Sequence, residues 1–317
     1  MEIERPNKIK TKAYLHFLIK LSLFFLLLIV LDFGIGKTLN FFYFHQQSGF
    51  QNRITYSIEK TQEDIIIIGS SRAKHHYIPD TIAKKLSQTC YNAGNNGQHI
   101  FYYYAILKSI LKRYSPKIII LDLKQREFCV NSESYERLSI LLPYYRSHEE
   151  IRSIIELKSS YEKYKLLSHI YPYNSSLFTI AAGNMEFNKK RKTDDNGFIP
   201  LIHTMTEPIN KDSTFAPYKF DSLKINAYQS FIKDCIKAKI KLYIVCSPYL
   251  AKSINTEPSI KTGKEIAKKY NIEFIDYSND TLYTHHLNLF ANPTHLNNLG
   301  ASLFSSKIAC KIVELNK

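Results

Sequence analysis

The sequence predicts an α/β domain with a parallel β-sheet, preceded by one N-terminal transmembrane helix. Two observations support this fold class. First, the 19-residue apolar stretch Phe17–Ile35 is about as long as a helix needs to be to cross a bilayer. Second, short β-branched runs alternate with helical patterns after it, which is typical of a parallel sheet with helices on both faces.

Basic residues flank the apolar stretch unequally. Four precede it, whereas only Lys37 lies between its end and Arg53. The positive-inside rule therefore keeps the N-terminus in the cytoplasm and exports the rest. No A-x-A-like cleavage site follows Leu31, which favours a retained anchor over a cleaved signal peptide. We expect a cytoplasmic tail (1–16), an anchor (17–36), a polar stalk (37–62) and a periplasmic domain (63–317) at the cytoplasmic membrane.

Strand and helix patterns alternate through the exported part. The run DIIIIG at 64–69 is typical of a strand buried on both faces. Further strands are expected at 117–123, 241–247 and 272–276, with a short one before Asn92. Helices are expected at 79–88, 99–113, 221–238, 259–270 and 297–315. The rhythm changes between about 130 and 220, which we interpret as a helical and loop insertion in the same domain.

The charge and cysteine content of the chain limit the classes of partner and cofactor that it can have. The chain has 317 residues, with 43 Lys and Arg against 28 Asp and Glu, a formal net charge of +15. This charge suits an anionic partner or simply a solvated, Lys-rich surface. Because no nucleic-acid-binding motif accompanies it, we expect no nucleic-acid partner. Five cysteines without CxxC spacing give neither a complete disulfide framework nor a zinc site, and no cofactor is expected.

Three polar segments lie where a parallel sheet is expected to expose groups at its carboxyl edge. They are Gly69–Arg72, Asn92–Gln98 and Asn292–Asn297. Taken singly, they read as a helix cap, an Asn-Gly turn and a surface loop. Together they place a serine, a glycine-rich turn and a histidine at one edge of the sheet.

In combination these segments resemble the SGNH/GDSL hydrolase superfamily, in particular its membrane-anchored, exported members linked to cell-envelope polysaccharides. The resemblance covers roughly Asp64 to the C-terminus and implies a three-layer, flavodoxin-like parallel sheet. It implies that Ser71 is the nucleophile, that the Gly97 amide helps to bind an oxyanion, and that His295 is the base. The most specific match is the family's Asp-x-x-His-Leu-Asn-x-x-Gly block, which here runs from Asn292 to Gly300.

Two departures from the family pattern bear on activity. The block after the strand at 117–123 lacks the family's asparagine, and Gln125 is the nearest substitute. The triad aspartate is Asn292, and an amide can orient a histidine but cannot stabilise its charged form. The sequence leaves open whether Asp276 or Asp280 supplies the missing carboxylate.

The sequence thus favours acyl transfer on an extracytoplasmic glycan, by an O-acetyltransferase or an O-acetyl esterase. A polysaccharide or acylated glycan would be the partner, and family analogy adds a membrane-bound acyl-donor protein. Arg72 could meet an anionic acceptor beside Ser71. The rival hypothesis, which Asn292 favours, is a non-catalytic glycan-binding or assembly protein that has kept the fold.

Overall fold

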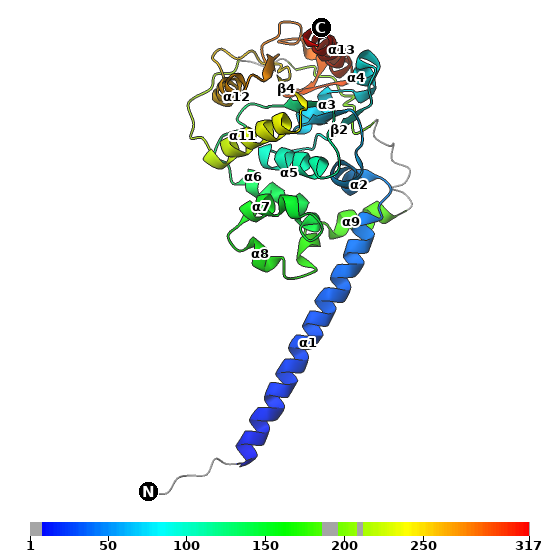
Figure 1. Cartoon of the computed structure of the whole chain (residues 1–317), viewed down its shortest axis with the longest axis vertical. Helices are drawn as coiled ribbons and strands as arrows, with labels where there is room; N and C mark the ends of the chain where they lie inside the picture. The colour runs from blue at the N-terminus through cyan, green and yellow to red at the C-terminus, as the bar shows by residue number, and fades with distance from the viewer. Residues whose placement is uncertain (1–7, 186–195, 208–211, 317) are drawn as a thin grey trace.

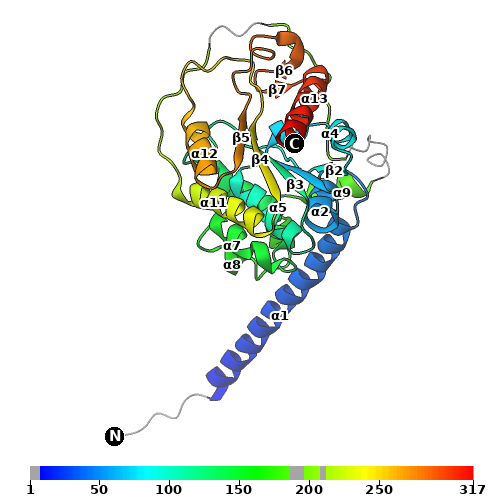
Figure 2. The same cartoon turned by 45° about the horizontal axis from the view of Figure 1, so that its top comes forward.

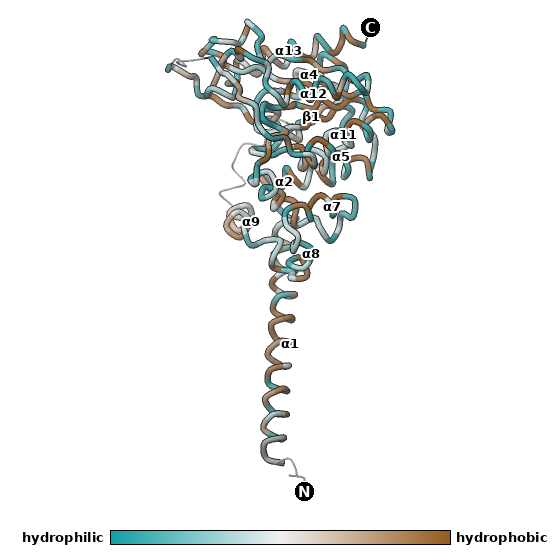
Figure 3. Tube along the Cα trace, turned by 90° about the vertical axis from the view of Figure 1, so that its left-hand side faces the viewer, coloured by the Kyte–Doolittle hydropathy of each residue, from teal (hydrophilic) through white to brown (hydrophobic). Residues whose placement is uncertain are grey.

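The structure, a computed structural model, describes residues 8–185, 196–207 and 212–316. It begins with one long helix, α1 (Lys8–Phe44), which projects from a folded domain (Figure 1). Part of the tail expected at 1–16 lies outside the described residues. By length and composition, Lys12–Phe44 is able to cross a membrane, and its most apolar part is exposed rather than packed in a core. Figure 3 shows the hydrophobic residues of α1 gathered along its free length.

The domain is built on a five-stranded parallel sheet in the order β2-β1-β3-β4-β5. This is the flavodoxin-like strand order, so the predicted fold class is confirmed. The strands are β1 (Ile65–Ile68), β2 (Cys90–Asn92), β3 (Ile118–Asp122), β4 (Lys241–Cys246) and β5 (Glu273–Asp276). Each lies within one or two residues of its predicted position.

Alternate residues of the strands enter two separate cores. In β1, Ile66 and Ile68 face one core, whereas Ile65 and Ile67 face the other. The first core is covered by α5 (Ile100–Leu111), α11 (Ser222–Lys237) and α12 (Pro258–Lys269), and the second by α4 (Pro79–Leu86) and α13 (Asn298–Leu315). Figure 2 shows α13 and α4 on one side of the sheet and α5 and α11 on the other. This arrangement gives the three layers.

The prediction of a polar stalk at 37–62 is wrong. Helix α1 continues to Phe44, and the chain then forms α2 (Gly49–Thr55) and a π-helical turn (Tyr56–Lys60). Tyr43, Ile54 and Ile58 are buried in the first core. The segment looked aperiodic because its few apolar residues are separated by polar ones, yet those few suffice to pack it against the domain.

The insertion is a set of short helices between α1 and the first core. They are α6 (Glu133–Glu136), η2 (Arg137–Tyr144), η3 (Glu149–Ile151), α7 (Arg152–Ile155), η4 (Glu156–Lys158), α8 (Glu162–Lys165), η5 (Tyr171–Tyr173) and α9 (Leu177–Asn184). Near the C-terminus, a short turn η6 (Leu287–Leu289) leads to the antiparallel pair β6 (Phe290–Asn292) and β7 (His295–Leu296). All five cysteines are unpaired.

Candidate active site

Ser71 lies just beyond the carboxyl end of β1, where it begins the short helix α3 (Ser71–His76). The preceding Ser70 is the N-cap, and its Oγ accepts a hydrogen bond of 3.2 Å from the Arg72 amide. Ser71 therefore belongs to the first turn of a helix, where amide groups lack intrahelical acceptors. This places the Ser71 hydroxyl beside backbone N–H groups at the edge of the sheet.

His295 meets Ser71 across 224 positions of sequence. Its Nε2 lies 2.7 Å from the Ser71 Oγ, so the predicted proximity of the two side chains is confirmed. The β6–β7 pair supplies the histidine, with Asn292 opposite His295 in the register. The Asn292 Oδ1 lies 2.9 Å from the His295 Nδ1. Serine, histidine and amide thus form one hydrogen-bonded row.

The amide orientation of Asn292 determines the tautomer of His295. The Asn292 Oδ1 accepts hydrogen bonds of 3.1 Å from the backbone amides of Thr294 and His295. An atom that receives two N–H groups must be the oxygen. The His295 Nδ1 facing it therefore carries a proton, and the Nε2 is left to accept the Ser71 hydroxyl proton. This is the tautomer that a general base requires.

The electrostatic surroundings make His295 a weak base. Burial, together with the positive charge of Arg72 and the neighbouring His75, lowers the pKa of His295 to about 4. All of these influences lower the pKa of His295, which agrees with an amide in place of a triad carboxylate. The imidazole is consequently neutral at physiological pH and ready to accept a proton, but its charged form is poorly stabilised.

This lowered pKa predicts an unusual pH profile. The rate at which Ser71 reacts with a fluorophosphonate should be level from about pH 8 to pH 5 and fall by half near pH 4, because only neutral His295 can act as a base. Circular dichroism at each pH would show that the fold persists. A midpoint near 6.5, the value of a solvated histidine, would contradict the environment described for His295.

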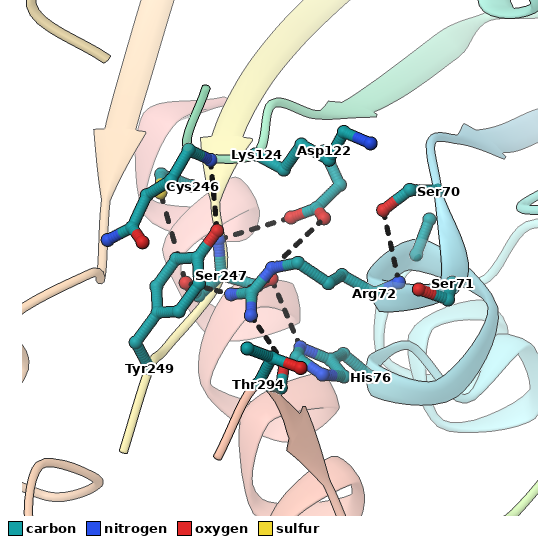
Figure 4. A network of polar contacts seen from close by, with 12 residues as sticks. Ser70, Ser71, Arg72, His76, Asp122, Lys124, Cys246, Ser247, Tyr249 and Thr294 are labelled. Atoms are coloured by element: carbon teal, nitrogen blue, oxygen red, sulfur yellow. Dashed lines mark hydrogen bonds and ion pairs between the residues drawn. The ribbon is translucent and has the colours of Figure 1, made fainter. Parts of the chain in front are cut away.

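Arg72 does not face a substrate, so its predicted binding role is wrong. Its side chain is buried, stacked 3.5 Å over the Tyr249 ring. Its two terminal nitrogens donate to three backbone carbonyls, at 2.6 Å to Thr294, 2.5 Å to Ser247 and 2.8 Å to Pro248. Figure 4 shows the guanidinium pointing away from the Ser71 hydroxyl into this cage. Arg72 therefore ties the serine turn to the loop that carries His295.

Behind Arg72 lies a buried carboxylate that sequence reasoning missed. Asp122, at the end of β3, is fully buried and accepts hydrogen bonds from the Tyr77 hydroxyl (2.7 Å) and the Ser247 amide (3.1 Å). Its Oδ2 lies 4.0 Å from the Arg72 Nε, and neither atom has a hydrogen-bond partner. Burial raises the pKa of Asp122, and the nearby Arg72 opposes that rise. The final aspartate of the run IIILD was the available signal.

His76 is a second residue whose role emerges only in the structure. It is buried, and its Nε2 accepts a hydrogen bond of 3.0 Å from the Leu296 amide. Its Nδ1, which must then carry the proton, lies 3.0 Å from the Ser247 Oγ. His76 therefore holds the strand that carries His295 against β4. The adjacent His75 is also largely buried, with its Nδ1 2.7 Å from the Ile199 carbonyl.

The second predicted segment joins the first through the backbone. The Asn95 amide donates to the Gly69 carbonyl at 3.0 Å, which holds the glycine-rich turn beside Ser71. Gly97 has a φ of +70°, a conformation that favours glycine. It lines a cavity of about 360 Å³ with Lys124 and Gln125, and neither Ser71 nor His295 lines that cavity. The oxyanion role of the Gly97 amide stays a prediction.

The proposed substitutes for missing family residues are occupied elsewhere. The Gln125 side-chain amide faces the Ser253 Oγ at 3.4 Å. Asp276 accepts from the Ser278 amide at 2.9 Å, and Asp280 pairs with Lys307. The group behind His295 is therefore Asn292 rather than either aspartate.

No protein-family model and no curated protein sequence matches the chain. Among solved structures, it is similar to one described as a "putative acylhydrolase" from Bacteroides fragilis, with 11% identity, a TM-score of 0.43, and coverage of 86% of this chain and 100% of that one. A GDSL-like lipase from Bacteroides thetaiotaomicron has 10% identity and a TM-score of 0.39, covering 79% and 88%. A "putative platelet activating factor" from Streptococcus pneumoniae has 11% identity and a TM-score of 0.41, covering 92% and 98%.

These identities and TM-scores are low, so the function proposed below rests on the residues of this chain. Its strand order and its Ser71–His295 pair agree with an SGNH/GDSL hydrolase fold. Membership of the membrane-anchored branch stays a prediction.

Proposed function

We propose that this chain is an extracytoplasmic serine acyl-transfer enzyme that acts on a cell-envelope glycan, as an O-acetyltransferase or an O-acetyl esterase. The observation that carries the proposal is the 2.7 Å contact between the Ser71 Oγ and the His295 Nε2. A serine hydroxyl becomes a useful nucleophile when an adjacent base takes its proton. Here the base is neutral, correctly protonated and within hydrogen-bonding distance.

The proposed reaction has two halves. The Ser71 Oγ attacks the acyl carbonyl of the donor while the His295 Nε2 takes the hydroxyl proton. The amides of Ser71 and Gly97 would hold the oxyanion of the tetrahedral intermediate. The intermediate collapses as His295 returns the proton to the leaving oxygen, which leaves an acyl ester on Ser71. A sugar hydroxyl or water then attacks that ester, giving its proton to His295, and Ser71 is released with its proton restored.

Export and the family resemblance support the glycan as substrate. If α1 crosses the cytoplasmic membrane with the basic tail inside, the site faces the compartment where envelope polysaccharides are modified. An acyl group would then have to come through the membrane, which suits a membrane-bound donor protein. This part of the proposal is an analogy with the exported branch of the superfamily.

A glycan-binding protein without catalysis is the second candidate, and Asn292 favours it. During attack His295 becomes an imidazolium, and it would be stabilised only by the dipole of the Asn292 amide rather than by a carboxylate charge. The positive charge of Arg72 acts against the same imidazolium. A glycan-binding protein never forms this imidazolium, so neither Asn292 nor the charge of Arg72 would impair its function.

A fluorophosphonate probe separates the two candidates. The wild-type chain in detergent should be labelled, and Ser71→Ala should abolish the labelling because the nucleophilic oxygen is gone. His295→Gln should lower the rate by at least about a hundred-fold, the usual scale of general-base catalysis. Ser306→Ala, which removes an exposed serine on α13, is the matched control and should label normally. A folded wild-type chain that does not label would favour the binding protein.

A further inference from the structure

The insertion presents an exposed mixture of apolar, aromatic and basic side chains beside the point where α1 leaves the domain. This membrane-facing patch consists of Tyr161, Lys163, Tyr164, Lys165 and Leu167, from α8 and the turns that flank it. Leu167 is 74% exposed, Tyr161 69% and Tyr164 60%. Figures 1 and 3 show α8 at the end of the domain from which α1 projects. The patch thus lies on the side of the domain that faces the anchor.

The turn after α8 is fastened directly to α1. Asp32 of α1 accepts hydrogen bonds from the Ser168 hydroxyl (2.5 Å), the His169 amide (2.7 Å) and the Ile170 amide (3.3 Å). One turn further along α1, a side chain at Gly36 would collide with His169, so only glycine permits this approach. The height of the turn along α1 is therefore fixed at Asp32.

The same turn is held from its other side. The Arg146 Nη2 donates to the carbonyls of Leu166 (2.7 Å), Leu167 (3.0 Å) and Ser168 (3.2 Å). With Asp32 binding its donors and Arg146 binding its acceptors, the turn is rigid. Leu167 is consequently presented outward by a fixed backbone.

The length of α1 places this turn at a bilayer surface. The anchor predicted at 17–36 has 20 residues, which at a rise of about 1.5 Å per residue spans about 30 Å, the thickness of a hydrocarbon core. Asp32 lies four residues, or about 6 Å, before the outer end of that span, which places it at the outer boundary of the bilayer. Any group attached at the height of Asp32 enters the headgroup layer.

The side chains of the patch suit that layer. Tyrosine is enriched at membrane interfaces, and lysine can extend its ammonium towards phosphates while its methylene stem stays in apolar surroundings. Lys163 lies 5.5 Å from the Tyr164 ring centre and Lys165 5.9 Å from that of Tyr171. The segment 161–170 carries Lys163 and Lys165 against a single acid, Glu162, which is buried and pairs with Lys165 at 3.4 Å. The excess of positive charge favours anionic lipids.

We propose that this patch inserts into the headgroup layer of the bilayer that α1 crosses, with Leu167 reaching the acyl boundary and the two lysines binding lipid phosphates. The domain is then held at two points and cannot swing about α1. This inference depends on the membrane anchoring that is part of the proposed function.

Because the chain contains no tryptophan, single introduced tryptophans can report depth. The full chain would be reconstituted into vesicles of phosphatidylcholine and phosphatidylglycerol, with or without bromine on the upper acyl carbons. Leu167→Trp reports the patch and Phe25→Trp the exposed middle of α1. Leu282→Trp is the matched control: Leu282 is 60% exposed, and its neighbour Tyr283 packs on Phe304 of α13, away from α1.

We expect brominated lipid to quench most of the emission at 167 and at 25, and to leave that at 282 unchanged, while aqueous iodide quenches only 282. If brominated lipid quenches the tryptophan at position 25, but the tryptophan at position 167 is quenched only by iodide, as at position 282, the patch lies in water. That result overturns this inference and leaves the anchor intact. If 167 is protected from iodide but unaffected by bromine, a protein covers the patch, which also overturns it. If 25 is not quenched, both the anchor and this inference are wrong.

Discussion

Replacing Arg72 with methionine is expected to lower the free energy of unfolding by about 3–5 kcal/mol, the usual effect of removing one partner from a buried ion pair. Asp122 is fully buried, and its Oδ2 lies 4.0 Å from the Arg72 Nε, which is too long for a hydrogen bond but close enough for attraction between charges. Without Arg72 the carboxylate has no counter-charge. The carbonyls of Thr294, Ser247 and Pro248 also lose their donor.

The measurement is the denaturation of the full chain in detergent, with Asp122→Asn and the double variant completing a cycle. Asparagine can still accept from the Tyr77 hydroxyl and the Ser247 amide, so the double variant removes the charge without opening a cavity. It should lose less stability than the two single variants together, by about 1–3 kcal/mol. A loss below about 1 kcal/mol for Arg72→Met would show that the guanidinium is not needed to hold the site.

pH gives an independent check on the same pair. Burial places the pKa of Asp122 above its value in the unfolded chain, so the folded state binds its proton first as the pH falls. Protonation removes the charge that Arg72 balances. Loss of Arg72 raises the pKa of the buried Asp122 further, so the variant takes up this proton at a higher pH than the wild-type chain. The stability lost in Arg72→Met should therefore shrink as the pH falls from the pKa of Asp122 in the folded variant to its raised pKa in the folded wild-type chain.

The fold could be predicted from sequence because its elements carry strong local signals. The four-isoleucine run at 65–68 fits only a strand covered on both faces, and strand–helix alternation then fixes a parallel sheet. Ser71 was found because it directly follows the first strand, whereas His295 was found through the resemblance of its segment to the last SGNH/GDSL block. The structure places His295 on β7, in an antiparallel pair outside the parallel sheet. Local pattern was therefore sufficient for the parallel sheet and for Ser71, but not for His295.

The roles of Arg72 and the 46–62 segment were not accessible in this way. Arginine after a serine in a loop reads as exposed, and only the tertiary fold shows carbonyls from β4 and from the β6–β7 turn surrounding its guanidinium. Similarly, Ile54 and Ile58 give little periodicity but fill gaps in a core made by distant helices. Burial of single residues in irregular segments depends on partners far away in the sequence.

Replacing Asn292 with aspartate is expected to raise the rate of Ser71 labelling by about ten-fold or more, as a neighbouring negative charge raises the pKa of His295 by roughly 1–3 units. The site is ready to accept a carboxylate. The Oδ1 already receives the amides of Thr294 and His295 and the ring Nδ1, which are all donors to an anion. Asn292 is exposed, so its second oxygen would be solvated rather than buried unpaired.

In a serine protease, replacing the triad aspartate with asparagine lowers turnover about ten-thousand-fold, because the histidine is then held in the wrong tautomer. The gain in labelling rate for Asn292→Asp should be smaller than that factor. In this chain the backbone amides keep the Asn292 oxygen towards His295, so the tautomer is already correct. Asn292→Asp adds only the charge. Asn292→Ala removes the acceptor altogether and should react more slowly than the wild-type chain, which gives the order Asp, Asn, Ala.

Two further readouts show whether the charge acts through His295. Asn298→Asp adds the same charge at another exposed asparagine, at the start of α13, and should leave the labelling rate unchanged. In Asn292→Asp the acid limb of the labelling profile should move from about pH 4 to higher pH, because the raised pKa keeps His295 protonated further up the scale. A faster reaction without that displacement would mean that the aspartate acts on something other than the base. If neither the wild-type chain nor Asn292→Asp is labelled although both are folded, Ser71 is not activated by His295. That result would favour the glycan-binding candidate.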